Sequence, residues 1–395
     1  MIAKGPYARL LALPQVRQLV ISSVVGRIPV GLTTLALVLF LQSRMGSLAD
    51  AGLAAACYVL GLALTAPVIG RAVDRAGPRR VLLACTAVYP TALVILTSIV
   101  LMAAHRRWVF AAALAAGASL PPITVCARAL YPRLVREVSL QRVAYSLDSA
   151  IIEAVFIVGP ALAAGFAALG IPAGAVLLAA ACAVAGGILF LRAEPVRAWQ
   201  PRGHSVAART ISPLRDPRLR GLIAAALLFA TAFGLFEIGV VGFATAQGAP
   251  AAGGVLLALA SVGSVLGVLV YGGRSWRLDV GRQFLVLLAL MTVGLAMLAP
   301  IDSLPLFALV VVVAAAPMAP VIAANSVLVS RVAAEDRVAE AFTWASTALL
   351  AGISAGTAVG GMLVERYSPP FALLAAAGAA LTAALVAYPV VRRDA

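Results

Sequence analysis

Five ionisable residues stand inside long apolar segments of this sequence, where charged side chains are rare. They are Arg27, Arg128, Asp148, Glu153 and Glu237. A charged group within a bilayer-spanning helix costs about 2.5 kcal/mol or more, so such groups usually face a partner or a water-accessible cavity. The chemistry that these residues predict is ion pairing, proton exchange or the binding of charged groups inside a membrane.

Composition indicates the elements that must hold these residues. The chain has 395 residues, of which 63% are hydrophobic and 11% charged, with a mean hydropathy of +1.05. A membrane-spanning helix needs roughly 20 apolar residues. Twelve such runs occur, at 15–41, 49–71, 80–103, 108–131, 142–168, 171–191, 219–246, 251–273, 282–300, 304–330, 338–364 and 370–391. The sequence therefore predicts an all-α membrane protein with twelve transmembrane helices. Because no room remains for a soluble catalytic domain, we do not expect an enzyme.

The net charge of +15 is distributed unevenly between alternate loops. One side of the predicted membrane carries 24 Lys and Arg residues, and the other side carries four, namely Arg44, Arg106, Arg107 and Arg366. This asymmetry follows the positive-inside rule, which places both termini in the cytoplasm of a multi-pass protein of the cell membrane. Membrane topology accounts for the charge, so we expect lipid and not nucleic acid around the chain.

The four cysteines stand singly in apolar runs, without CxxC spacing or a nearby histidine; they are Cys57, Cys85, Cys126 and Cys182. Free cysteines in such settings usually pack as small hydrophobic residues. We expect no metal site and no bound cofactor.

The chain also repeats itself. The longest polar interruption, residues 192–220, divides the runs six and six, and a shift of 203 positions lays Pro14 on Pro217 and Arg71 on Arg274. A shift of 198 aligns the fourth run with the tenth. We predict two pseudo-symmetric bundles with a binding cavity between them. Their bounds are 1–192 for the N-terminal bundle, 193–217 for a cytoplasmic linker and 218–395 for the C-terminal bundle.

Between the second and third runs stands Gly70-Arg71-Ala72-Val73-Asp74-Arg75-Ala76-Gly77-Pro78-Arg79-Arg80. It resembles the Gly-x-x-x-Asp-Arg-x-Gly-x-Arg-Arg signature of the major facilitator superfamily, found in the cytoplasmic loop between helices two and three. The resemblance implies that superfamily's fold and a cytoplasmic gate, in which Asp74 and the nearby arginines hold the halves together in one state. The implied gate residues are Gly70, Asp74, Arg75, Gly77, Arg79 and Arg80. The corresponding segment of the second half, residues 272–277, lacks the aspartate.

A second motif, Gly159-Pro160-Ala161-Leu162-Ala163-Ala164-Gly165, lies in the fifth run. It resembles the Gly-Pro motif in the fifth helix of the drug/proton antiporters of this superfamily, where Gly159, Pro160 and Gly165 would allow a kink and close helix packing. A packing face of small residues is the alternative. Antiporters of this branch commonly carry an arginine midway along the fourth helix, and residues 108–126 contain none.

The buried charges suggest specific partners. At a rise of about 1.5 Å per residue, Arg27 lies about 15 Å beyond Arg17, and Glu153 lies about 16 Å beyond Arg142. Helices one and five are neighbours in the superfamily fold, so we predict that Arg27 and Glu153 pair across the N-terminal half of the cavity. Such a pair would either couple protonation to transport or fix helix packing as a static ion pair.

The other charges have alternative roles. Asp148 is roughly 140° around the helix from Glu153, and it serves either the cavity or a structural pair with a cytoplasmic arginine. Glu237 is expected to face the cavity, as a proton carrier or as a binder of a cationic substrate group. Arg128 is expected to extend toward the cytoplasm or to contact Asp74 in the gate, with substrate binding as the less favoured alternative.

Three residues of the second half complete the candidate set. Glu340, at the start of the eleventh run, belongs with the gate or acts only as a helix N-terminal acid. Asn325 and Trp344 are placed at the inner end of the cavity. Prolines at equivalent places in the fourth and tenth runs predict flexed helices, with Pro121 and Pro122 in one and Pro317 and Pro320 in the other.

The hypothesis is a secondary active transporter that works by alternating access. It would export a small amphipathic or hydrophobic organic compound, such as a drug or natural product, with the proton gradient as its energy source, and act as a monomer. Walls of Ala, Val, Leu and Phe suit such a compound better than a sugar, which needs many hydrogen-bonding side chains. The alternatives are a sugar or metabolite carrier of the same fold and a membrane sensor that transports nothing.

Overall fold

The computed structural model describes residues 5–103, 105–199, 213–250 and 252–392. Twelve of its helices or helix pairs are long and apolar enough to span a membrane, so the predicted fold class is confirmed. The helices are α1 (Pro6–Leu11), α2 (Pro14–Met45), α3 (Leu48–Ala76), α4 (Pro78–Leu101), α5 (Arg106–Ala118), α6 (Ile123–Leu134), α7 (Val138–Ala168), α8 (Pro172–Arg192), α9 (Glu194–Arg197), α10 (Pro217–Ala246), α11 (Ala252–Gly273), α12 (Val280–Leu298), α13 (Leu304–Ala315), α14 (Met318–Val332), α15 (Val338–Arg366) and α16 (Pro369–Arg392).

Two of the twelve spans are interrupted. The fourth span consists of α5 and α6, which are separated at Ser119–Pro122, and the tenth consists of α13 and α14, which are separated near Pro317. Proline lacks the backbone N–H that would bond to the preceding turn, and its ring crowds that turn. The breaks therefore occur at the prolines that the sequence marked as flexing points, and at equivalent places in the two halves.

Each half packs its six spans in the same pattern. The first span, α2, contacts α7 and α8, and the seventh, α10, contacts α15 and α16. Likewise α3 packs on α5 as α11 packs on α13. In both of these pairs glycines allow close approach, because an added Cβ at Gly117 would meet Tyr58 and one at Gly263 would meet Val312. The observed packing follows the internal repeat found in the sequence.

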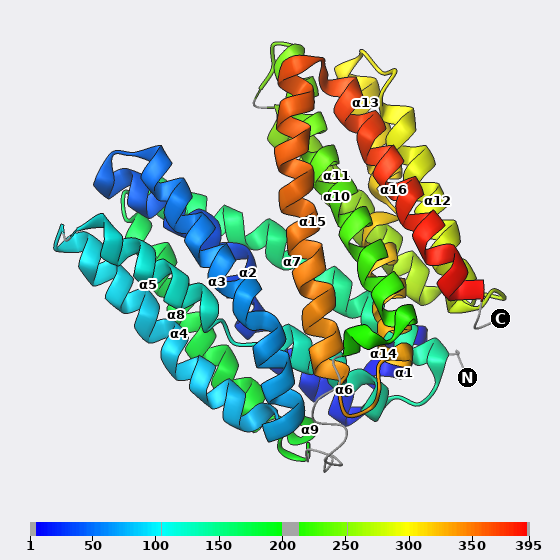
Figure 1. The fold of residues 1–395 in the computed structure, drawn as a ribbon, viewed down its shortest axis with the longest axis horizontal. Helices are drawn as coiled ribbons and strands as arrows, with labels where there is room; N and C mark the ends of the chain where they lie inside the picture. The colour runs from blue at the N-terminus through cyan, green and yellow to red at the C-terminus, as the bar shows by residue number, and fades with distance from the viewer. Residues whose placement is uncertain (1–4, 104, 200–212, 251, 393–395) are drawn as a thin grey trace.

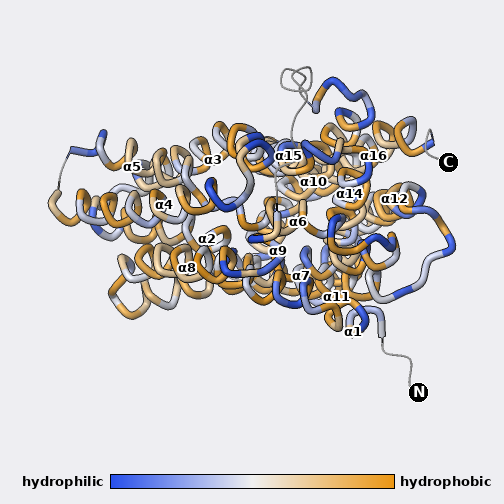
Figure 2. Tube along the Cα trace, turned by 90° about the horizontal axis from the view of Figure 1, so that it is seen from below, coloured by the Kyte–Doolittle hydropathy of each residue, from blue (hydrophilic) through white to orange (hydrophobic). Residues whose placement is uncertain are grey.

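The helices of the two halves converge at one end and diverge at the other (Figure 1). We call the converging end the linker end, because α8 ends there at Arg192 and α10 begins there at Pro217. Of the predicted linker, 193–217, residues 200–212 lie outside the described ranges. Seen from the linker end, the helices are largely hydrophobic, and hydrophilic segments gather in loops and at helix ends (Figure 2).

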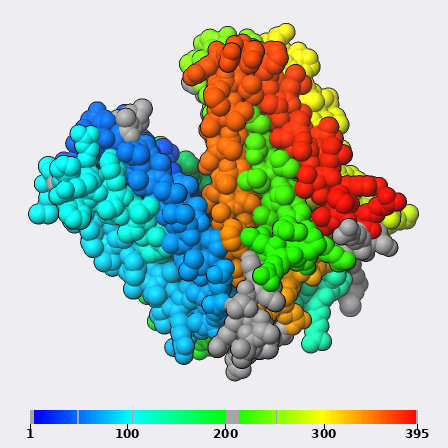
Figure 3. Space-filling model, viewed as in Figure 1, coloured from blue at the N-terminus to red at the C-terminus, as the bar shows by residue number. Residues whose placement is uncertain are grey.

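Between the halves the surface is deeply hollowed on the side away from the linker end (Figure 3). Part of this hollow is a pocket of about 470 Å³, formed by α2 and α3 of one half and α15 of the other. Its lining is mostly apolar and consists of Thr34, Ala55, Ala56, Val59, Leu60, Ala63, Leu350, Ala351 and Ser354. The halves themselves meet through α3 with α15 and through α7 with α11.

Candidate functional site

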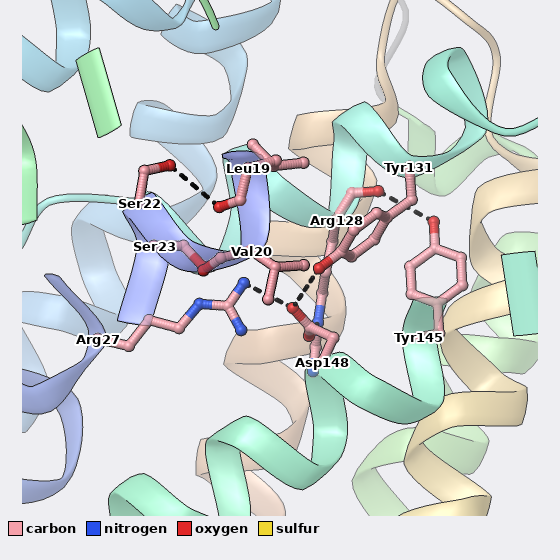
Figure 4. Close-up of polar contacts among 9 residues, drawn as sticks. All are labelled: Leu19, Val20, Ser22, Ser23, Arg27, Arg128, Tyr131, Tyr145 and Asp148. Carbon is pink, nitrogen blue, oxygen red and sulfur yellow. Dashed lines mark hydrogen bonds and ion pairs between the residues drawn. The ribbon is translucent and has the colours of Figure 1, made fainter. Parts of the chain in front are cut away.

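A fully buried charge cluster joins three spans of the N-terminal half (Figure 4). Asp148 on α7 lies between two arginines, with its Oδ1 2.6 Å from Nη2 of Arg27 on α2 and its Oδ2 2.7 Å from Nε of Arg128 on α6. The hydroxyl of Tyr131 also donates to Oδ1 at 3.3 Å. The Arg27 and Asp148 side chains are 0% exposed, so protein groups alone compensate these charges in this state.

The predicted pair of Arg27 with Glu153 is therefore wrong, because Arg27 pairs with Asp148. Depth along a helix does not fix direction around it, and Asp148 occupies the face of α7 that turns to α2 and α6. The long arginine side chain also reaches a carboxylate about one turn away in depth. The expectation for Arg128 is wrong as well: it neither contacts Asp74 nor extends toward the loops, but binds Asp148. Asp148 was predicted to serve the cavity or to pair with a cytoplasmic arginine; it pairs instead with two arginines that lie within spans.

Two guanidinium groups surround one carboxylate in this cluster, so it carries one formal positive charge in excess. Among the described residues, Nε and Nη1 of Arg27 have no hydrogen-bond partner. Removing one member of a buried ion pair leaves an uncompensated charge, which costs about 3–5 kcal/mol. The cluster therefore fixes α2, α6 and α7 relative to one another.

Glu153 lies instead at the interface of the two halves. Its Oε1 accepts a hydrogen bond of 3.1 Å from the hydroxyl of Ser264 on α11. The Ser264 oxygen in turn accepts the backbone N–H of Ala319 at 3.1 Å, and Ala319 stands in the first turn of α14, directly after the break in the tenth span. A helix N-terminus carries partial positive charge, so the relay links a carboxylate of one half to a favourable helix end of the other.

Glu237 stands apart from both arrangements. It is exposed on α10, one turn before Val241, which lies against Gly253 at the start of α11. No hydrogen bond or ion pair joins Glu237 to another described residue. Asn325 is buried and Trp344 is partly buried, and the Oδ1 of the first and the Nε1 of the second have no partner within the described ranges. Their predicted places along the cavity stay predictions.

The gate motif closes the linker end on the α3–α15 side. Asp74 accepts the backbone N–H groups of Ala339 at 3.1 Å and Glu340 at 2.7 Å. These are the second and third residues of α15, whose own N-cap, Arg337, makes no side-chain cap hydrogen bond. Asp74 thus caps a helix of the opposite half. Arg71 adds an ion pair, with Nη2 2.7 Å from Oε1 of Glu340.

The glycines of the motif have distinct positions. A Cβ at Gly70 would come within 2.9 Å of the Ala339 carbonyl oxygen, so glycine lets α3 approach α15. Gly77 connects α3 to α4 with φ +81°, a conformation that residues with a side chain rarely adopt. Arg79 and Arg80 are exposed on α4, and Arg75 is exposed at the end of α3.

The motif of the fifth span is a close packing site. A Cβ at Gly159 would lie 2.5 Å from the backbone of Gly31 on α2, whereas one at Gly165 would meet nothing within 4 Å. Pro160 stands inside α7, which continues through it to Ala168. For Gly159, the packing alternative therefore fits the geometry.

Sequence reasoning missed the contacts that close the linker end on the α7–α11 side. The guanidinium of Arg142 on α7 donates to the carbonyl oxygen of Arg274, at 3.1 Å, directly after the last turn of α11. The hydroxyl of Tyr7 on α1 donates to the Leu269 carbonyl oxygen of α11 at 2.9 Å. Burial raises the pKa of Tyr7 to about 12, so this hydroxyl keeps its proton at physiological pH. No hydropathy signal marked α1, and Arg142 reads as an ordinary loop arginine.

Among the described residues, no group of three or more His, Cys, Asp and Glu side chains could hold a metal ion. The site consists of a buried charge cluster, an interfacial carboxylate and two sets of contacts that close one end of a hollow between two six-span halves. This combination is typical of a membrane transport protein.

Comparison with known proteins identifies the family. Residues 19–274 match the model of the Major Facilitator Superfamily, and the chain belongs to this superfamily. It is 28% identical over 292 residues to the uncharacterized MFS-type transporter y4rN of Sinorhizobium fredii, covering 67% of this chain and 68% of that protein. The chain is therefore a multi-pass membrane transporter and not an enzyme.

Solved structures share the fold at low identity. A bacterial homologue of the iron transporter ferroportin, in its outward-facing state, has a TM-score of 0.78 at 15% identity, over 95% of this chain and 99% of that one. The human organic anion transporter MFSD10 (TETRAN) has a TM-score of 0.74 at 16% identity, over 94% and 99%. The proton:xylose symporter XylE has 0.72 at 12% identity, over 95% and 96%. These transporters handle different substrates, so the likeness concerns architecture.

Proposed function

We propose that this chain is a proton-coupled exporter of a small amphipathic or hydrophobic organic compound. It lies in the cell membrane, with both termini in the cytoplasm. The positive-inside distribution supports this orientation. The linker end is then cytoplasmic, and the hollow on the other side opens outward. The apolar lining of the pocket between α2, α3 and α15 suits a compound with much apolar surface.

The observation that carries proton coupling is the relay from Ala319 through Ser264 to Glu153. Ser264 accepts the Ala319 N–H, so its own hydroxyl proton points to the Glu153 carboxylate. A hydrogen bond to an ionised acceptor is roughly twice as strong as a neutral one. The relay therefore stabilises the ionised form of Glu153, and it does so only while α7 and α11 keep their present positions.

This dependence gives the coupling a direction. A proton that enters from the outward-facing hollow neutralises Glu153, weakens the relay and so disfavours the present state. The protein then changes toward the inward-open state, where the proton is released to the cytoplasm and substrate binds. Export of substrate against entry of protons is the antiport cycle that this sequence of events produces.

The experiment uses proteoliposomes with an imposed pH gradient and the fluorescent amphipathic cation ethidium as probe. We expect the wild-type protein to accumulate ethidium when the gradient is applied. Glu153→Gln should abolish this accumulation but retain downhill exchange of ethidium, because the neutral side chain still hydrogen-bonds Ser264. The matched control is Glu365→Gln, which removes an exposed carboxylate in the last turn of α15 and should leave the accumulation unchanged. Gradient-driven accumulation that persists in Glu153→Gln would exclude the coupling role, and inactivity of the wild type across a panel of amphipathic compounds would exclude the substrate class.

A further inference from the structure

A groove of about 520 Å³ lies at the linker end on the outside of the N-terminal half, where α2 packs against α8. Its lining has two arginines, two polar and three apolar side chains, namely Pro14, Arg17, Gln18, Ile21, Ser22, Leu189 and Arg192. None of these residues belongs to the charge cluster, the Glu153 relay or the closing contacts. The transport features described above therefore do not account for this groove.

The charge of this groove is uncompensated. Arg17 and Arg192 are both exposed, and neither forms an ion pair with a carboxylate in the described parts of the chain. Gln18 accepts the backbone N–H of Glu194 at 3.2 Å through its Oε1, which leaves its amide N–H groups free to donate. Two guanidinium groups and an amide thus present hydrogen-bond donors to one space. Such a set fits a phosphate, because arginine presents paired N–H groups to phosphate oxygens.

The apolar part of the groove indicates what carries that phosphate. Ile21 and Leu189 are exposed on the membrane-facing surface, by 66% and 45%. Ile21 lies about one turn deeper in the first span than Gln18, and Leu189 lies about one turn deeper in the sixth span than Arg192. An acyl chain that follows these side chains into the bilayer would remain attached to a headgroup at the arginines. A free phosphate would not use this apolar wall.

We propose that this groove binds one phospholipid with a net negative headgroup, of the phosphatidylglycerol type, from the leaflet on the linker side. The phosphate lies between Arg17 and Arg192, and an acyl chain lies along Ile21 and Leu189. The lipid then joins the ends of the first and sixth spans at the linker end. Anionic lipids attract basic residues close to the membrane surface, with an effect of about fivefold in affinity for each arginine.

The internal repeat supplies a matched control. The shift of 203 positions lays Arg17 on Arg220, and Arg392 ends α16 as Arg192 ends α8. Both Arg220 and Arg392 are exposed. The double variant Arg220→Gln/Arg392→Gln therefore removes the same charge at the same depth in the other half, and it leaves this groove unchanged.

The experiment measures lipids retained by the purified full-length protein in native mass spectrometry, with phosphatidylglycerol, phosphatidylcholine and inorganic phosphate as separate probes. We expect one tightly retained phosphatidylglycerol and about 10-fold or greater loss of it in Arg17→Gln/Arg192→Gln. Ile21→Trp, which fills the groove without changing charge, should lose it as well. The Arg220→Gln/Arg392→Gln protein should retain it.

Three results would overturn the proposal. Equal loss in both double variants would mean general surface electrostatics, and equal retention of phosphatidylcholine would mean that headgroup charge is irrelevant. Thermal unfolding is measured with each probe as well. If inorganic phosphate protects the protein as strongly as phosphatidylglycerol does, the groove is a small-anion site. If Arg17→Gln/Arg192→Gln does not purify as a folded protein, Ile21→Trp and the single variants decide the question.

Discussion

The two contacts that close the linker end are related by the internal repeat, yet they use opposite chemistry. On the α3–α15 side, Arg71 pairs with Glu340. The repeat shifts of 203 and 198 lay Arg71 on Arg274 and Arg142 on Glu340, so the equivalent residues of the α7–α11 side are two arginines. There Arg142 donates to the backbone carbonyl of Arg274, and the Arg274 guanidinium lies 5.8 Å from the Trp276 ring centre.

The second copy of the gate motif needs no aspartate, because it contacts the opposite end of a helix. Asp74 places negative charge at the N-terminus of α15, and Arg142 places positive charge at the C-terminus of α11. Both arrangements are favourable, because the two ends of a helix carry opposite partial charges. The position equivalent to Asp74 is Arg277. The second half therefore closes through the C-terminus of α11, which carries partial negative charge and accepts from an arginine.

This comparison can be tested with two reporter cysteines in a background without the four native ones. Thr343→Cys reports on the α3–α15 side and Ser146→Cys on the α7–α11 side, since both side chains are buried at these contacts. The rate of reaction with a membrane-impermeant maleimide added at the linker end measures how often each site opens. If the halves move as rigid bodies, weakening either side should accelerate both reporters equally.

The largest effect is expected for Asp74→Ala. It removes two hydrogen bonds to a charged acceptor and leaves two N–H groups of α15 without a cap. A loss of about 3 kcal/mol corresponds to about 100-fold faster labelling. Asp74→Asn, which keeps one acceptor oxygen, should give an intermediate rate. A rate within twofold of wild type for Asp74→Ala would contradict the capping role.

Arg142→Gln should have the next largest effect. Arg142 is 6% exposed, and its loss leaves the Arg274 carbonyl without its guanidinium donor. We expect about 10-fold faster labelling, from a loss of about 1.4 kcal/mol. Acceleration confined to Ser146→Cys would mean that the two sides open independently, and the rigid-body comparison would then fail.

The same contacts mark the limit of prediction from sequence. Hydropathy is a one-dimensional signal, so the twelve spans and the two breaks near prolines could be predicted. The contact of Asp74 with the other half could be expected because its motif is continuous along the chain and resembles a known signature. The partner of Arg27 could not, since it depends on rotation around α7, where five positions separate Asp148 from Glu153. The Ser264 relay was missed for a similar reason: a single serine in an apolar span gives no signal of its direction.

Arg71→Gln should have a smaller effect than Arg142→Gln. The Arg71 side chain is 39% exposed, and water and salt weaken an ion pair at such a site. We expect labelling about threefold faster, from a loss of about 0.6 kcal/mol. The difference from wild type should shrink at 1 M salt, whereas the Asp74→Ala effect should not. Salt-independent acceleration would show that Arg71 acts through packing and not through its charge.

The smallest effect is expected for Tyr7→Phe, which removes one neutral hydrogen bond to the α11 carbonyl. A loss of about 0.5 kcal/mol corresponds to labelling about twofold faster, with Ser146→Cys as the reporter. The raised pKa of Tyr7 determines the pH dependence. Because the pKa is about 12 in the structure and 10.0 in the free side chain, the contribution is complete below pH 10 and is lost as pH rises through 12. The ratio of variant to wild-type rates should therefore stay constant between pH 6 and 9, measured with a maleimide calibrated at each pH. A ratio that falls within this range would mean that the Tyr7 hydroxyl ionises there and is not buried against α11.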